Sequence, residues 1–151
     1  MYPGTFNIIL NNKDGGKVSF FFIQQTRFEQ YFKQQHPKMQ YDPTKVVLAI
    51  STIKTKPIIN CLYLSDDLFF AARYHSGLDY FADGFSLTGT QIKKMSLHEE
   101  LLSVKLTIET NVILKNGQPM ILKLNLPKLN RTPWHIRNLK KLRLQFAAKK
   151  N

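Results

Sequence analysis

The sequence predicts an α+β fold: an antiparallel, β-rich barrel or strongly bent sheet with a C-terminal amphipathic helix, plus an N-terminal β-β-α extension. Two observations carry this prediction. Short segments in which apolar and polar residues alternate recur between turn residues, a pattern typical of antiparallel strands. The C-terminal segment instead repeats its apolar residues every three or four positions, as one face of a helix does. With 151 residues, the chain is expected to form a single domain, in which residues 1–44 are the extension and residues 45–151 the β-rich part.

The N-terminal extension is predicted to be a β-hairpin followed by a helix. The hairpin strands are residues 5–11 and 17–24, joined by a turn rich in Asn and Gly. Thr26 and Glu29 have the spacing of a capping box, which predicts that Thr26 caps the helix. Pro37 disfavours helical geometry at the residue before it, so the helix is expected to end there. The apolar face of this helix consists of three aromatic residues, Phe28, Tyr31 and Phe32.

Seven strands are predicted in the β-rich part. Residues 102–114 include the clearest alternation, with apolar side chains on one side and polar side chains on the other. Asn116-Gly117 follows this strand and predicts a two-residue type I′ hairpin turn, which needs positive φ at both residues. The seven predicted strands are residues 45–52, 57–64, 68–75, 81–87, 91–97, 102–114 and 120–124.

The last helix is predicted at residues 133–148. Pro133 suits its first position, where the missing amide proton is not needed. Trp134 is expected either to pack against the β-rich part or to serve as an exposed anchor for a membrane interface or a partner. The buried face of this helix is predicted to consist of Ile136, Leu139, Leu142 and Phe146.

From residue 45 onward, the order of seven strands and one C-terminal helix resembles that of bacterial pleckstrin-homology-like and GRAM-like barrel domains. The resemblance covers residues 45–148, and the N-terminal β-β-α unit departs from the minimal core of that family. It implies a scaffold whose members bind lipids, peptides or proteins, and such a fold does not by itself fix a function. Three segments are similar to the corresponding parts of these domains: CLYLSDDLFFAARY at 61–74, GFSLTGTQIKKMSLHEELLSV at 84–104 and VILKNGQPMILKL at 112–124.

The positive charge of the chain is concentrated near its C-terminus. The net charge is +12, and all ten acidic residues lie at or before Glu109, so the last 42 residues carry +10. Such asymmetry indicates either an anionic partner or a surface charge that only keeps the protein from self-associating. The candidate residues for binding an anion or a partner are Arg131, Arg137, Lys140, Lys141 and Arg143.

The sequence contains none of the common catalytic or cofactor-binding motifs. Its four histidines do not have the spacing of a zinc site, and a single cysteine cannot build one with them. Cys61 lies in an apolar strand and is predicted to be a buried small side chain rather than a nucleophile. Asp66 and Asp67 are predicted to be turn residues. We therefore expect no enzymatic activity, no catalytic residue, no metal and no cofactor.

One loop combines polar and aromatic side chains. His75, Asp79 and Asp83 lie close in sequence to Tyr74 and Tyr80. Loops positioned by a rigid sheet often carry binding residues, and most polar loops are simply solvated. The sequence leaves both interpretations open for this cluster.

Two functional hypotheses follow. The first is a non-enzymatic interaction module of pleckstrin-homology-like architecture that binds a protein partner or an anionic surface. The second is a nucleic-acid-binding protein whose basic C-terminal helix contacts phosphates. The sequence predicts no transmembrane segment and no secretory signal, and its single cysteine favours a cytoplasmic location. It leaves open the identity of the partner and whether the chain forms a homo-oligomer.

Overall fold

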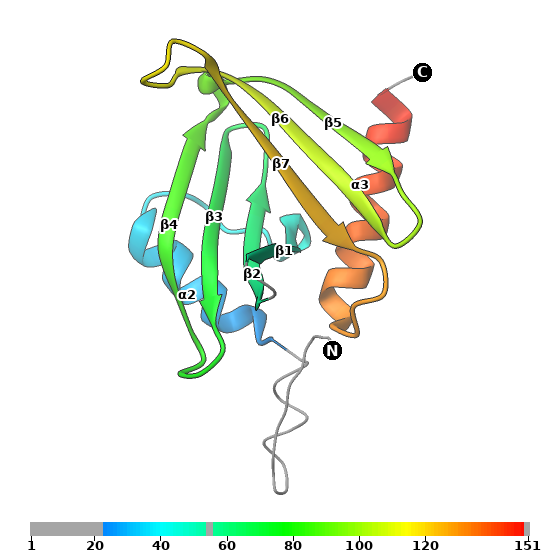
Figure 1. Cartoon of the computed structure of the whole chain (residues 1–151). Coiled ribbons are helices and arrows are strands. Elements are labelled where there is room, and N and C mark those ends of the chain that lie inside the picture. The colour runs from blue at the N-terminus through cyan, green and yellow to red at the C-terminus, as the bar shows by residue number, and fades with distance from the viewer. Residues whose placement is uncertain (1–22, 54–55, 150–151) are drawn as a thin grey trace, which may run out of the picture.

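The computed structural model describes residues 23–53 and 56–149 (Figure 1). The predicted N-terminal hairpin lies outside these residues, apart from positions 23 and 24, which are not in a strand. The described part of the chain contains two α-helices, two short 3-10 helices and seven strands. In chain order they are α2 (Gln25–Gln35), η1 (Pro43–Lys45), β1 (Val46–Ile53), β2 (Lys56–Leu64), β3 (Leu68–His75), β4 (Tyr80–Thr88), η2 (Gly89–Gln91), β5 (Ile92–Glu99), β6 (Ser103–Ile113), β7 (Pro119–Pro127) and α3 (Pro133–Lys149).

The strands form two antiparallel sheets, in the orders β1-β2-β3-β4 and β5-β6-β7. Within each sheet, consecutive strands pair, with Leu48 opposite Cys61 in the first sheet and Leu106 opposite Leu124 in the second. The predicted α+β class and the seven predicted strands are confirmed. No hydrogen-bonded pair of described strands joins the two sheets, so they are not a closed barrel, although β1 lies against β7.

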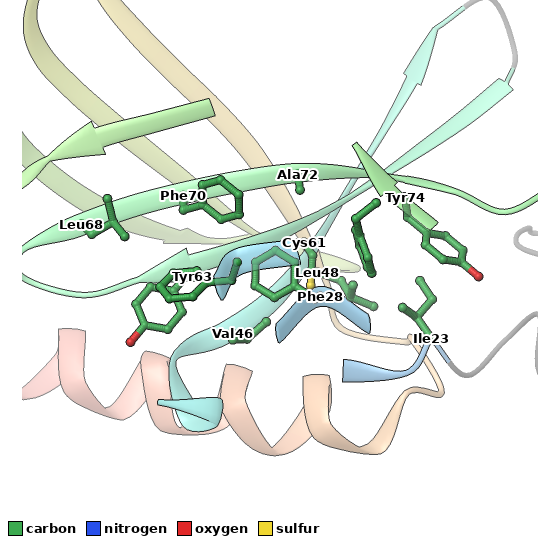
Figure 2. Packing of buried hydrophobic residues seen from close by; sticks show 12 residues of the cluster. Ile23, Phe28, Val46, Leu48, Cys61, Tyr63, Leu68, Phe70, Ala72 and Tyr74 are labelled. Carbon is green, nitrogen blue, oxygen red and sulfur yellow. The ribbon is translucent and has the colours of Figure 1, made fainter. Parts of the chain in front are cut away.

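The first sheet is buried on both faces, because α2 covers one face and the second sheet covers the other. Val46 and Leu48 of β1 belong to the cluster beneath α2, whereas Val47 and Ala49 belong to the cluster between the sheets. Figure 2 shows the cluster beneath α2, in which Phe28 lies among side chains of β1, β2 and β3. A strand buried on both faces has apolar residues at every position, which explains the uninterrupted apolar run in β1.

The helix α2 begins without the predicted capping box. Its N-cap is Gln24, whose side chain makes no capping hydrogen bond, and Thr26 lies inside the first turn. The prediction at Thr26 is therefore wrong. The start of the helix is held instead by Gln25, whose Nε2 donates to Tyr41 Oη at 3.1 Å and to the carbonyl oxygen of Pro43 at 2.7 Å. Hydrogen bonds to residues distant in sequence, and not a local cap, therefore hold the start of α2.

The aromatic face of α2 packs on the first sheet as the sequence predicts. Phe28 and Phe32 are fully buried, and Tyr31 is half-buried. The Oη of Tyr31 accepts the backbone N–H of Gly84 at 3.0 Å, where β4 bulges toward the helix. A Cβ at Gly84 would lie 3.1 Å from this oxygen, so the close approach of helix and strand favours glycine. The helix ends at Gln35, as expected.

The hairpin between β6 and β7 differs from the predicted two-residue turn. The backbone N–H of Leu114 donates to the carbonyl oxygen of Gln118 at 2.8 Å, so the loop contains three residues, 115–117. Only Gly117 has a positive φ, of 82°. The side chain of Asn116 accepts the N–H of Gln118 at 3.0 Å, and this local hydrogen bond favours the longer loop. The type I′ prediction at Asn116-Gly117 is wrong in turn type and right in position.

Replacing Gly117 with valine is expected to destabilise the protein by about 1–3 kcal/mol, because a β-branched residue is strained at positive φ. A Cβ at this position would meet no atom within 4 Å, so the effect arises from the backbone alone. Gly77 also has open space around it but lacks the positive φ, which makes Gly77→Val the matched control. Urea denaturation measures both variants, and equal losses of stability would contradict the role of φ.

The helix α3 spans Pro133–Lys149 and buries the predicted face only in part. Ile136 is 39% exposed, so its predicted place in the buried face is wrong. The buried residues are His135, Asn138 and Leu139. The two polar side chains, His135 and Asn138, face β1 and form hydrogen bonds with its backbone. Of the predicted face, Leu139 is confirmed as buried, and Leu142 and Phe146 are half-buried.

Trp134 joins the last helix to the start of the described chain. Its Nε1–H donates to the carbonyl oxygen of Ile23 at 2.8 Å, and its ring packs against the cluster beneath α2. An indole that is packed and hydrogen-bonded in this way is not an exposed anchor. Of the two alternatives for Trp134, packing against the body of the protein is confirmed.

Candidate binding groove

Arg143, one of the predicted anion-binding residues, is already paired with an acid of this chain. Its Nε and Nη2 donate to the two carboxylate oxygens of Glu99, at the end of β5, over 2.8 and 2.7 Å. Lys128 Nζ lies 3.0 Å from the same carboxylate. Hydrogen bonds from Arg143 and from Lys128 lower the pKa of Glu99. The bidentate pair therefore ties α3 to β5, and Arg143 is not a free cation.

Of the other predicted residues, Arg137, Lys140 and Lys141 lie three and four positions apart and therefore share one side of α3. Lys141 is already engaged, because its Nζ donates to Thr44 Oγ1 at 3.2 Å. Arg137 and Lys140 are exposed, and neither forms an ion pair within the described ranges. Arg131 is also exposed and precedes the helix. The structure therefore does not bring all five candidates together, because Arg143 is paired with Glu99 and Arg131 lies before the helix.

A groove of about 570 Å³ lies between β5 and the C-terminal half of α3. Ile92 to Leu97 line it without interruption, and the facing side of α3 supplies Leu142 and Phe146. Side chains of consecutive strand residues point to opposite faces of a sheet, so a lining of consecutive residues means that the edge of β5 borders the groove. The apolar side chains of the groove are Leu64, Ile92, Met95, Leu97, Leu142 and Phe146.

Among the described strands, none is hydrogen-bonded to the edge of β5 that faces this groove. β5 lies at the end of the second sheet and pairs with β6 alone among the described strands. An edge strand carries a row of backbone N–H and C=O groups that a further strand can pair with. A bulge between Ile92 and Lys94 interrupts the β5–β6 register at one end of this edge. The remaining residues of β5 form a regular edge.

Lysines outnumber acids on the walls of the groove. Lys45 comes from η1, Lys93 and Lys94 from β5, and Lys149 from α3, where its Nζ lies 5.4 Å from the centre of the Phe146 ring. Asp66 is the single acid among the lining residues. Four cations from three separate elements give the groove a positive potential. None of these lysines was among the residues selected from the sequence, because no sequence motif links them.

The loop cluster selected from the sequence is assembled, and its geometry is accounted for by the fold. The His75 and Tyr80 rings stack at 4.6 Å, and Tyr74 Oη donates to Asp79 Oδ1 at 2.6 Å. Asp79 and Asp83 have positive φ, at the end of the β3–β4 turn and at the β4 bulge respectively. Asp residues tolerate this conformation, so the strain is that of a hairpin and a bulge.

The structure gives no support for chemistry at the remaining candidates. Cys61 is fully buried, and burial raises the pKa of its thiol well above the ordinary value, so the side chain is structural as predicted. Within the described residues, no three His, Cys, Asp or Glu side chains lie where they could hold a metal ion. No helix in the same part of the chain is long and apolar enough to cross a membrane.

Comparison of the chain with protein-family models, with characterised proteins and with solved structures found no match. The groove between β5 and α3 is therefore interpreted from its own residues.

Proposed function

We propose that this chain is a non-enzymatic interaction module of pleckstrin-homology-like architecture, which binds an extended acidic segment of a partner protein in the groove between β5 and α3. Two antiparallel sheets of four and three strands, followed by a helix, support that architecture. The single, buried Cys61 supports a cytoplasmic location as part of the same proposal. The observation that carries the proposal is the edge of β5, which no other described strand pairs with, beside an apolar and cationic groove.

An extended segment fits the three features of the groove together. The free edge of β5 offers main-chain hydrogen bonds, as in other cases where a peptide adds a strand to a sheet. Alternate side chains of an added strand point to one side, where the apolar side chains of the groove, such as Met95 and Phe146, lie. The lysines favour Asp and Glu at the other positions. Six lining residues of β5 correspond to a bound segment of about six residues.

Nucleic acid fits the same surface less well. Binding to a phosphate backbone requires several free cations along one track. Arg143 is bound to Glu99, and Lys141 donates to Thr44, so two of the candidate cations on α3 are already engaged. The groove is also lined by six apolar side chains, for which a phosphate backbone has no counterpart. The free cations Arg137 and Lys140 nevertheless make duplex DNA a necessary second arm of the test.

Titration of the isotope-labelled protein with a peptide of about eight residues that alternates Glu and Val tests the proposal. We expect the backbone amide signals of β5 and the C-terminal half of α3 to shift. Exchanging Lys93 and Lys94 for Glu places like charges opposite the peptide and is expected to weaken binding at least tenfold. The matched control exchanges Lys115 and Lys123 for Glu, because both are exposed on the β6–β7 hairpin and change the net charge equally.

Two results would contradict the groove as a peptide site. One is an equal loss of affinity in the control variant, which would show that the change in net charge alone weakens binding. The other is tight binding of duplex DNA that depends on Arg137, Lys140 and Lys141. Each phosphate contact lowers log K by about 0.9 per unit of log salt, so exchanging these three residues for Gln would then flatten the slope by about 2.7.

A further inference from the structure

Three exposed leucines lie together at the end of the second sheet. Leu101 and Leu102 occupy the β5–β6 turn and are 89% and 60% exposed, and Leu129 in the β7–α3 connection is 76% exposed. The backbone N–H of Lys128 donates to the carbonyl oxygen of Leu102 at 3.0 Å, which holds the two loops side by side. Figure 1 shows both loops at the same end of the second sheet, next to α3. We call these three leucines the leucine tip.

Basic residues surround the leucine tip. Arg131 follows Leu129 by two positions and is exposed. Ile136, Lys140 and Arg143 share one flank of α3, because residues three, four and seven apart lie on one face of a helix. Arg143 fixes this flank to Glu99, at the start of the β5–β6 turn. The cations around the tip are Lys105, Lys128, Arg131, Lys140 and Arg143, and the nearby acids Glu99 and Glu100 are both engaged in ion pairs.

We propose that the leucine tip inserts into an anionic phospholipid bilayer, with the surrounding cations held at the lipid headgroups. Exposed apolar side chains next to basic ones are the combination that binds such an interface, since the apolar groups enter the acyl boundary while the charges attract acidic lipids. Arg131 and Lys140 are exposed and outside the ion pairs of the described chain, so they are free to meet the headgroups. Long basic side chains keep their charge at the interface while their stems lie along apolar surface.

A bilayer explains this surface better than the two other occupants. A second copy of the chain would place these cations opposite each other, and a chain with a net charge of +12 repels itself. The acidic peptide proposed above needs a groove with a strand edge, whereas the leucines project from two turns. The leucine tip and the peptide groove are formed by different residues, because the groove is lined by Ile92 to Leu97 and the tip begins after Glu100. The two proposals are therefore independent.

Cosedimentation of the full chain with vesicles tests the leucine tip. The vesicles are phosphatidylcholine alone or with about 30% phosphatidylserine, at about 50 mM salt. We expect binding to the anionic vesicles and little binding to the neutral ones. Exchanging Leu101, Leu102 and Leu129 for Ser is expected to lower the partition coefficient at least tenfold. Exchanging Arg131 and Lys140 for Gln is expected to lower it about fivefold for each charge removed.

Matched controls come from two loops and a strand that do not form the leucine tip. Leu78, which is 79% exposed in the β3–β4 loop, is exchanged for Ser, and Lys115 and Lys123 are exchanged for Gln. All exchanged side chains are exposed, so every variant is expected to keep the unfolding midpoint of the wild type, which is measured first.

Four results would overturn the bilayer proposal. They are no binding of the wild type to anionic vesicles, equal losses in the controls, loss in the charge variant without loss in the leucine variant, and a dimer in sedimentation velocity that the leucine variant dissociates. The third result would show adsorption by charge alone, and the fourth would assign the leucine tip to a second copy of the chain. The peptide titration contains no lipid, so the outcome of either experiment leaves the other unaffected.

Discussion

Replacing Phe32 with alanine is expected to lower the free energy of unfolding by about 3–5 kcal/mol, the range for truncating a buried aromatic residue. Phe32 is fully buried in α2. Its ring centre lies 4.6 Å from that of Tyr63, 5.2 Å from that of Tyr41 and 5.7 Å from that of Phe70. The substitution removes one partner from each of these aromatic contacts and leaves a cavity between helix and sheet. Urea or thermal denaturation measures the loss.

Gln34 on the exposed side of the same helix provides the control. Gln34→Ala changes the composition of α2 without touching the sheet, and we expect its effect to stay within about 0.5 kcal/mol. If Phe32→Ala also changes stability by less than 1 kcal/mol or so, α2 is an appendage rather than the outer layer of the fold. The burial of the first sheet on both faces would then be wrong.

The strands were predictable because their side-chain pattern is local. Alternation in β6 separates buried Val104, Leu106 and Ile108 from their more exposed neighbours, and the strand spans residues 103–113 against the predicted 102–114. The division into two sheets was not predictable in the same way. It depends on which distant segments meet, such as β1 and β7, and no periodicity within one strand contains that information.

Two local signals were overruled by contacts that the signals do not include. Thr26 and Glu29 have capping-box spacing, but the start of α2 is fixed by the hydrogen bonds of Gln25 to Tyr41 and Pro43, far along the chain. Asn-Gly predicts a two-residue turn from backbone freedom alone. The side chain of Asn116 takes up a hydrogen bond of its own, and the loop gains a residue.

The binding surfaces show the same division between local and distant information. The +10 charge of the C-terminal segment is visible in the sequence, and it predicts binding residues mainly on α3. The lysines of the groove come from η1, β5 and α3, and only the fold brings them together. The sequence does not indicate which strand has an exposed edge. The residues of β5 have the pattern of any half-buried strand, and only the order of the described strands shows that β5 is at the end of its sheet.

The apolar periodicity of the last helix does not indicate the polar contacts that hold α3 in place. His135 is fully buried, and its Nδ1 accepts the backbone N–H of Leu48 in β1 at 2.9 Å. Its Nε2 therefore carries the proton and donates to the carbonyl oxygen of Pro127, at the end of β7, at 2.8 Å. Asn138 Nδ2 donates at 2.8 Å to the carbonyl oxygen of Val46. These bonds connect β1 to β7 through α3, where no ladder joins the sheets within the described residues.

The burial of His135 makes the stability of the protein depend on pH. Burial lowers the pKa of this imidazole to about 4, from an ordinary value of 6.5, because the charged form is disfavoured inside the protein. Protonation would also place a second N–H against the donor of Leu48. The unfolded chain therefore binds a proton at a higher pH than the folded chain does. The contribution of His135 to stability is fully present above pH 6.5 and is lost as the pH falls toward 4.

Acidification from pH 7 to pH 4 is expected to lower the free energy of unfolding by about 3 kcal/mol through His135, since each unit of pKa difference is worth about 1.4 kcal/mol. Urea denaturation at half-unit steps of pH measures this slope. His135→Gln removes the titrating group, so we expect lower stability at pH 7 and a shallower slope between pH 6.5 and 4. His98 is exposed on β5, and His98→Gln should keep the slope of the wild type. A wild-type slope in His135→Gln would show that other groups set the acid sensitivity, and that α3 is not held in place by a neutral imidazole.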